Sequence, residues 1–351
     1  MSDFFEEGLQ STRAVLEDWF ARQMPEAKDV RVEKIDRLAG GSHELLDVML
    51  GWRAEGVSHH APVMVRFDPV RFRKRRSSNL FREFEIQSIL GKRGDVPVPE
   101  VLWIEKDEQL LGASFYAMRK IEGRVPSDRP GYRQVGWVVD LDREERKALW
   151  ESAVSTLAKL HTVPVSELGS LRFDPGDTDD FGQHVSNQRE NYLWATDGMA
   201  NPTVDGAWDW LLTNLPANRP QGITWGDARY GNMMFDGVTC CAVLDWEDVS
   251  LGGPLFDLGR WCLSEKLNDV WGHPRLEGMG NREETLALWE EHSGLSSADV
   301  RWYELFTACF AAGLTARIAQ VQSQSTDAPK APPGFTGSVL DDIIRDWMDT
   351  M

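Results

Sequence analysis

Three oxygen-bearing side chains lie close together in the second half of the chain, and their types and spacing suit phosphoryl transfer. Asp227 precedes Asn232 by five residues, and Asp245 follows two short apolar segments. An amide oxygen and a carboxylate together form a hard oxygen site, which suits Mg²⁺ held between protein and phosphate oxygens. Asp227 could orient, or accept a proton from, a hydroxyl group that attacks a γ-phosphate.

The apolar segments 233–235 and 242–244 predict a β-hairpin that positions these side chains. A connecting loop of about 237–240 pairs the first residue of one segment with the last residue of the other and places Asn232 beside Asp245. A tight two-residue turn near the start of that loop would instead carry Asp245 about 13 Å past Asn232. We therefore predict the longer loop.

The two parts of this region read GITWGDARYGNMMF and AVLDWEDVSLGGPLFDLGRW. This combination resembles the aminoglycoside phosphotransferase family, which shares the protein-kinase-like fold, and the resemblance extends over most of the chain. It implies an ATP- and Mg²⁺-dependent kinase that transfers the γ-phosphate to a hydroxyl group of a small molecule. By the same resemblance, Asp227 is the catalytic residue, and Asn232 and Asp245 are the metal ligands.

The resemblance also implies a nucleotide site in the first part of the chain. A small-residue loop would let backbone N–H groups approach phosphates, a strand cation would pair with a helix glutamate, and a hinge would hold adenine through backbone groups. The residues at these positions are Gly40, Gly41 and Ser42 in the loop, Arg66 and Glu83 in the ion pair, and Met118, Arg119 and Ile121 in the hinge. Glu85 is the alternative to Glu83 as the glutamate that pairs with Arg66.

Two residues depart from the family pattern. Arg66 stands where the family has a lysine; it keeps the charge, but its planar guanidinium is not interchangeable with an ammonium group. Trp225 stands where the family usually has a histidine, two residues before Asp227. Asp257 resembles a buried carboxylate that braces the catalytic loop, and His161 resembles a structural histidine.

The elements around these residues predict an α+β, bilobal fold. Short β-rich segments at 31–38, 44–52, 61–67, 100–105 and 113–119 predict a small antiparallel sheet, with helices at 9–20 and 80–90. Later segments predict helices at 142–161, 205–214, 282–292, 300–322 and 338–349. We expect a nucleotide-binding lobe over 1–120 and a helical lobe over 121–351 that contains the segment 224–247 and the acceptor site.

The net charge of the chain excludes some classes of binding partner. The formal net charge is −18, nearly all of it after residue 130, so a phosphate backbone or an anionic membrane surface would repel the chain. We expect no nucleic acid partner, no membrane partner and a cytoplasmic location, and the oligomeric state is unknown. The basic run Arg71–Arg76 is either a solvated loop or a grip for an anionic substrate.

The acceptor is not determined by the sequence. Carboxylates of the helical lobe suit an aminoglycoside-like cation, whereas the basic run and the many tryptophans suit a hydroxyacyl-CoA-type compound. A second hypothesis, based on Arg66 and Trp225, is a non-catalytic or attenuated nucleotide-binding protein of the same fold. Glu247 is an additional candidate metal contact.

Overall fold

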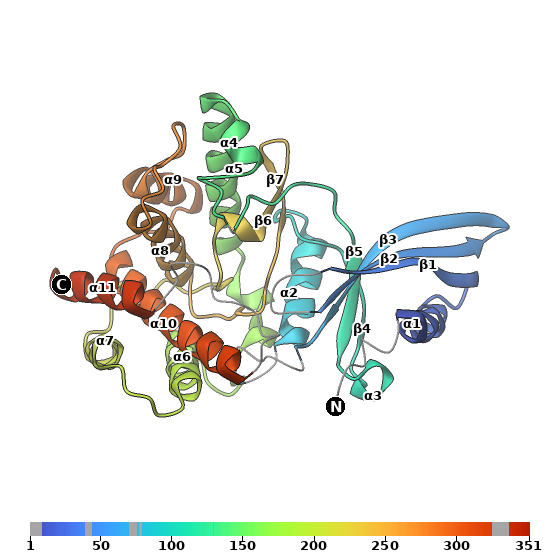
Figure 1. Ribbon diagram of the computed structural model, residues 1–351, viewed down its shortest axis with the longest axis horizontal. Coiled ribbons are helices and arrows are strands. Elements are labelled where there is room, and N and C mark those ends of the chain that lie inside the picture. Colours follow the sequence, from blue (N-terminus) through green and yellow to red (C-terminus); the bar gives the residue numbers. More distant parts are fainter. Residues whose placement is uncertain (1–8, 39–43, 70–75, 77–78, 129, 325–336) are drawn as a thin grey trace.

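The fold is α+β, with a small antiparallel sheet at one end of the molecule and a larger group of helices at the other, which confirms the predicted class (Figure 1). The computed structural model describes residues 9–38, 44–69, 76, 79–128, 130–324 and 337–351. The predicted phosphate loop of Gly40, Gly41 and Ser42 and most of the basic run therefore lie outside the described residues.

The sheet has five strands in the order β1-β2-β3-β5-β4, and neighbouring strands are antiparallel. The predicted meander of the first three strands is confirmed. The strands are β1 (Lys28–Leu38), β2 (Leu45–Ala54), β3 (Val57–Phe67), β4 (Val101–Glu105) and β5 (Phe115–Arg119), and the short helix α3 (Glu108–Leu111) connects the last two.

One face of the sheet is buried because apolar residues alternate along its strands. Leu46, Val48 and Leu50 of β2 are each at most 2% exposed. The helix α1 (Leu9–Gln23) covers this face, and the ring of Trp19 lies 4.8 Å from that of Phe115 on β5. This cluster is the hydrophobic core of the sheet lobe.

The helix α2 (Leu80–Arg93) lies between the sheet and the other helices (Figure 1). Gly94 ends it in a left-handed conformation, and the Gly94 N–H donates to the carbonyl of Leu90 at 2.9 Å. Ile86 and Leu90 are fully buried and pack in the core of the helical lobe. One helix of the first part of the chain is therefore anchored in the second part.

The helical lobe contains the predicted helices and two long ones that the sequence did not predict. The predicted ones are α5 (Arg143–His161), α7 (Pro202–Thr213), α9 (Arg282–Ser293), α10 (Val300–Gln324) and α11 (Gly337–Met348). The others are the short α4 (Trp137–Asp140) and the long α6 (Asp180–Thr196) and α8 (Leu255–Val270). The first residues of α8, Leu255 to Gly259, are all buried, whereas Ser264, Glu265 and Lys266 of its later turns are partly exposed.

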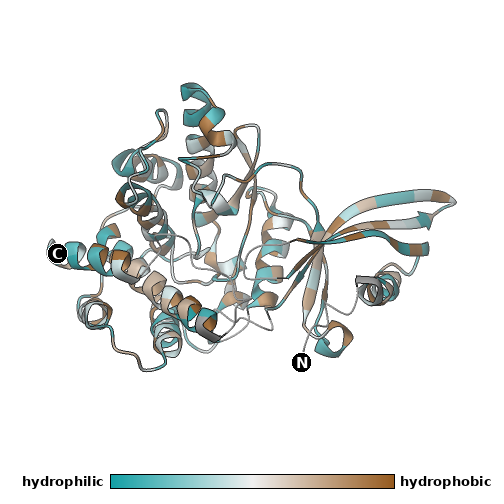
Figure 2. Ribbon diagram, in the orientation of Figure 1, coloured by the Kyte–Doolittle hydropathy of each residue, from teal (hydrophilic) through white to brown (hydrophobic). Residues whose placement is uncertain are grey.

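Figure 2 shows both hydrophobic and hydrophilic residues around the helices of this lobe, as expected where one face packs inward. The last helix, α11, buries Leu340, Ile344 and Trp347 against its neighbours. Within the described part of the chain, no helix is both long enough and apolar enough to cross a membrane.

The predicted hairpin after Asn232 consists of β6 (Met233–Asp236) and β7 (Thr239–Val243), and its turn differs from the prediction. Asp236 pairs with Thr239, so the turn has two residues and the predicted longer loop is wrong. Cys241 is an extra, unpaired residue in β7, a β-bulge that partly compensates for the short turn. As a result Met233 pairs with Val243, and not with residue 244 as predicted. The carbonyl of Asn232 then accepts from Leu244 at 2.9 Å, so Asp245 follows immediately after the partner of Asn232.

Candidate active site

Asp227 and Asn232 are hydrogen-bonded to each other. The amide Nδ2 of Asn232 donates to the Asp227 carboxylate Oδ2 at 2.7 Å and to its backbone carbonyl at 2.9 Å. Because Nδ2 is used in this way, Oδ1 of Asn232 is the atom left for other ligands; it accepts no hydrogen bond from any residue that the structure describes.

Two arginines that the sequence analysis did not single out hold the other side of Asp227. Arg229 Nε lies 3.0 Å from Oδ2, and Arg260 of α8 lies 2.6 Å from Oδ1 through Nη2. Burial alone would raise the pKa of Asp227, but the two guanidinium groups lower it well below its usual range. Asp227 is therefore an ionised carboxylate throughout the neutral range.

Arg229 could have been found by its spacing from Asp227, whereas Arg260 could not. Arg229 lies two residues after Asp227, and Arg260 follows Asp257 within the segment PLFDLGRW. Arg229 also forms an ion pair with Asp128. The pair of contacts at Arg260 could not be predicted, because α8 itself was not predicted.

Asp245 lies across from the sheet and contacts it through Arg66. Its backbone has φ 59°, a left-handed conformation that a non-glycine residue seldom adopts. Arg66 Nη2 lies 3.0 Å from Asp245 Oδ1, while Arg66 Nε lies 2.8 Å from Glu83 Oε2. Glu83, and not its rival Glu85, is the partner of the strand arginine, and it is 1% exposed.

Trp225 links the loop of Asp227 to the end of the hairpin. Its indole Nε1 donates to the carbonyls of Leu244 at 2.8 Å and Asp245 at 3.1 Å. One of these carbonyls belongs to Asp245, whose backbone is in the left-handed conformation, and the other belongs to the residue before it. The residue that replaces the usual histidine therefore packs inside the protein and also holds the backbone of the second acidic residue.

Asp257 holds the backbone just before Asp227 by hydrogen bonds, which is the role that the resemblance implied. Its two carboxylate oxygens each accept a backbone N–H, from Trp225 and from Gly226, both at 2.7 Å. His161 Nε2 lies 2.9 Å from the same carboxylate, and the indole of Trp289 donates to His161 Nδ1 at 2.8 Å. Since Nδ1 accepts, His161 is a neutral imidazole that donates through Nε2.

The hinge residues lie at the junction of the two lobes. Met118 and Arg119 end β5, and the Arg119 N–H already donates to the carbonyl of Glu100 at 2.9 Å. Lys120 donates to Pro62 at 3.2 Å. Ile121 is the next residue, and its N–H donates to no acceptor within the described part of the chain, so it is the amide of this segment best able to bind a ligand.

Comparison with known proteins identifies the family. A model of the phosphotransferase enzyme family matches residues 56–295, well over half of the chain. The chain belongs to this family. The match includes Arg66, Glu83 and the whole segment from Trp225 to Asp257.

Curated relatives of this phosphotransferase family member are much longer proteins. Acyl-CoA dehydrogenase family member 11 of Homo sapiens is 28% identical over 230 residues, which cover 63% of this chain and 28% of that protein. The protein of the same name from Rattus norvegicus is 32% identical over 185 residues, covering 52% of this chain and 22% of that protein. The matched region is thus less than a third of the length of these relatives.

Solved structures of phosphotransferases share the fold. A candidate aminoglycoside phosphotransferase from Ralstonia eutropha JMP134 has a TM-score of 0.71 and 22% identity, covering 96% of this chain and 98% of that one. APH(4)-Ia in a ternary complex with ADP and hygromycin B has a TM-score of 0.58 and 13% identity, covering 95% and 98%. The macrolide 2'-phosphotransferase MphH from Brachybacterium faecium has a TM-score of 0.53 and 16% identity, covering 90% and 99%. These likenesses confirm the kinase-like fold.

Proposed function

We propose that this protein is an ATP- and Mg²⁺-dependent kinase that phosphorylates a hydroxyl group of a small molecule. The observation that carries the proposal is the arrangement of Asp227, Asn232 and Asp245 at one end of the hairpin, opposite the ion pair of Arg66 and Glu83. A polar turn would explain one buried carboxylate. It would not explain three oxygen-bearing groups at one end of the hairpin, one of which, Asp245, contacts the buried Arg66.

In the proposed reaction, the acceptor oxygen forms a bond to the γ-phosphorus while the bond from that phosphorus to the β–γ bridging oxygen breaks, and ADP leaves. Asp227 orients the acceptor hydroxyl and receives its proton. Because Arg229 and Arg260 lower the basicity of Asp227, we infer that it orients the hydroxyl first and takes the proton late, as a loose transition state permits.

The donor set fits Mg²⁺, which prefers oxygen ligands and is usually shared between one or two protein side chains and substrate phosphates. Oδ1 of Asn232 and the carboxylate of Asp245 would hold the ion, whose charge would neutralise the developing charge on the phosphates. Arg66 would bind phosphate oxygens, and the N–H of Ile121 would bind adenine. Glu247 contributes to the electrostatic environment of Arg66, and its contact with metal stays a prediction.

The first experiment measures ADP release from Mg²⁺-ATP with a panel of hydroxylated acceptors, including aminoglycosides, amino alcohols and hydroxyacyl-CoA compounds. We expect Asp227→Asn to lower turnover by about 10²–10⁴-fold, the usual contribution of a positioned acid-base group, and to leave nucleotide affinity unchanged. The matched control is Asp128→Asn, which also removes a carboxylate from Arg229 and should retain turnover. Near-normal turnover of Asp227→Asn would reject the assignment.

A second candidate is a nucleotide-binding protein without catalysis. It is favoured by the two ion pairs that occupy Asp227 and by the arginine at position 66. Nucleotide binding with no ADP release for any acceptor would support it. Acceptor-dependent ADP release that Asp227→Asn abolishes would exclude it.

A further inference from the structure

Neighbouring donors occupy both oxygens of the Asp227 carboxylate. Oδ1 accepts from Arg260 Nε at 2.8 Å and lies 2.6 Å from Arg260 Nη2. Oδ2 accepts from Asn232 Nδ2 at 2.7 Å and from Arg229 Nε at 3.0 Å. An ionised carboxylate has about four lone-pair sites, half of them on each oxygen, and each oxygen here faces two nitrogen atoms. An acceptor hydroxyl therefore binds this carboxylate by replacing one of these donors.

Asn232 is held too firmly to be the donor that leaves. Its Nδ2 also donates to the backbone carbonyl of Asp227 at 2.9 Å, and the residue is only 5% exposed. The same orientation of the amide leaves Oδ1 of Asn232 for the proposed metal ion. Turning the amide away from Asp227 would therefore also remove the metal ligand.

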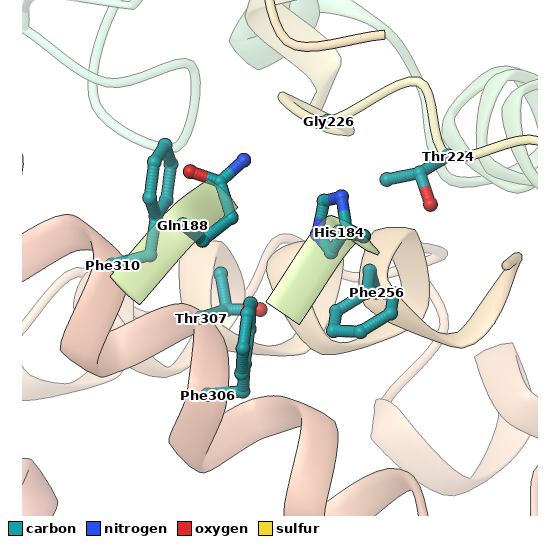
Figure 3. Close-up of a pocket in the computed structure, with 8 residues that line it drawn as sticks. All are labelled: His184, Gln188, Thr224, Gly226, Phe256, Phe306, Thr307 and Phe310. Atoms are coloured by element: carbon teal, nitrogen blue, oxygen red, sulfur yellow. The ribbon is translucent and has the colours of Figure 1, made fainter. Parts of the chain in front are cut away.

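Arg260 is held in place by the packing of its helix, α8. The neighbouring Gly259 lies so close to α10 that a Cβ there would be 2.6 Å from the backbone oxygen of Tyr303. The start of the same helix lies beside the catalytic loop: Figure 3 shows Phe256 of α8 and Gly226 of the loop around one small hollow. Because helix and loop are packed together, Arg260 keeps its two nitrogen atoms on Oδ1.

Arg229 has the weakest contact with the carboxylate. Its distance to Oδ2 is the longest of the four, and it lies in the same loop, two residues after Asp227. Its Nη1 pairs with Asp128, so the guanidinium keeps an ion pair when Nε leaves Oδ2. Gly231 gives this side chain its space, since a Cβ there would lie 2.5 Å from Arg229 Nη1. Arg229 is therefore the donor that an acceptor can displace.

We propose that Arg229 covers Oδ2 in the empty site and leaves it when the acceptor hydroxyl binds, while Arg260 remains on Oδ1 and positions the carboxylate. This inference rests on the proposed kinase function and gives the two arginines different roles in it. With Oδ2 uncovered and no acceptor bound, water would take the acceptor's place. Its oxygen would bond to the γ-phosphorus, the bond to the β–γ bridging oxygen would break, and Oδ2 would receive the proton. Arg229 thus limits the hydrolysis of ATP to ADP and phosphate.

The first test measures ADP release from Mg²⁺-ATP with water as the only acceptor. Arg229→Met removes the donor from Oδ2 and should raise this hydrolysis by about fivefold, the upper end of what a partly exposed ion pair contributes. Arg260→Met should lower it by about tenfold, because the carboxylate loses its fixed orientation. The matched control is Arg172→Met, which breaks an ion pair with Asp180, outside the site, and should leave hydrolysis unchanged.

Gly231→Ala separates the position of Arg229 from its charge. The added methyl group would displace Arg229 Nη1, while the guanidinium stays charged. We expect hydrolysis to rise again, by up to about fivefold, and we expect Asp227→Asn to abolish the rise in either variant. A rise in Arg229→Met alone would mean that the charge matters and not the position, and would overturn the proposal. An equal rise in Arg260→Met would overturn it as well.

The second test does not depend on catalysis. NMR measures how fast the Nε–H groups of Arg229 and Arg260 exchange with water in the ligand-free protein, with Arg229→Lys and Arg260→Lys used to assign the signals. A contact that opens more often exchanges faster, so the Arg229 Nε–H should exchange about tenfold faster than that of Arg260. Equal rates, or a faster Arg260, would overturn the proposal. Faster exchange at Arg229 without ADP release from any protein, with any acceptor, would keep the displaceable contact and reject the kinase function.

Discussion

At the scale of single residues, Arg66 is fitted to two carboxylates at once. Its Nε faces Glu83 on α2 and its Nη2 faces Asp245 at the end of the hairpin, so one planar group connects the sheet, the helix and the catalytic segment. An ammonium group carries its three donors on one nitrogen at the end of a flexible stem, so it does not hold two carboxylates in the fixed planar geometry of a guanidinium group. We therefore expect the arginine to be required at this position, and not merely tolerated in place of a lysine.

The two contacts of Arg66 predict what happens when it is replaced by lysine, the residue of the family pattern. Arg66→Lys should lose one of the two ion pairs and raise the KM for ATP by about tenfold, since breaking one side of a partly buried pair costs more than a surface pair. Steady-state kinetics with varied ATP measure this. Arg53→Lys, at an exposed ion pair in β2, is the control and should leave KM unchanged. A lower KM or a gain in turnover for Arg66→Lys would mean that the natural protein is attenuated.

At the scale of elements, the first turn of α8 fixes the catalytic loop through Asp257. This carboxylate is fully buried and accepts two backbone N–H groups and the imidazole of His161. Asparagine has one oxygen and would turn an NH₂ group toward a donor. The loop that carries Asp227 would then lose a fixed end.

Asp257→Asn should lower the free energy of unfolding by about 1–3 kcal/mol, because it leaves a buried backbone donor unsatisfied. It should also lower turnover, since Asp227 depends on the same loop. Urea unfolding and ADP release measure the two effects. Asp209→Asn, an exposed position on α7, should change stability by less than about 0.5 kcal/mol. Equal stabilities of Asp257→Asn and the wild type would contradict the bracing role.

The elements also show what the sequence could predict. Strands with alternating burial, such as β2, and helices with polar caps, such as α5 with its Asp142 capping box, were predicted close to their true bounds. The helix α8 was missed because its first five residues, Leu255 to Gly259, are buried on every side, and an exposed polar face begins only later in the helix. The hairpin turn was misjudged because a bulge at Cys241 leaves no mark in residue type, and its register depends on pairing that only the folded chain defines.

In the candidate site, too, some residues could be predicted from the sequence and others only from the folded chain. Asp227, Asn232, Asp245 and Asp257 are identified by a linear motif. In the structure Asn232 donates to Asp227, and Asp257 accepts from the backbone of Trp225, two residues before Asp227. The contact of Arg260 with Asp227 depends on how α8 packs against the loop, which residue spacing does not define. The motif residues could therefore be predicted from local spacing, whereas a contact made by helix packing could not.

At the scale of the whole molecule, the described residues form two separate hydrophobic clusters, one under the sheet and one among the helices. The second includes Ile86 and Leu90 of α2, while Glu83 of the same helix contacts Arg66 of the sheet. We propose that the two clusters unfold in separate steps and that a nucleotide bound between them joins the steps. Such coupling requires that the nucleotide contact both sides.

Calorimetry tests this coupling. Without ligand, we expect two overlapping transitions, with the sheet cluster unfolding first because it is smaller. Mg²⁺-ATP at about 100 times its Kd should stabilise the folded state by about 2.7 kcal/mol and move the lower transition toward the upper one, since ligand release would then accompany the first step. ATP with EDTA is the control and should raise the temperature of the lower transition by less. Asn232 and Asp245 belong to the helical part of the molecule, and they would contact the phosphates only through the metal ion. A lower transition unaffected by Mg²⁺-ATP would show that the nucleotide does not bridge the two clusters.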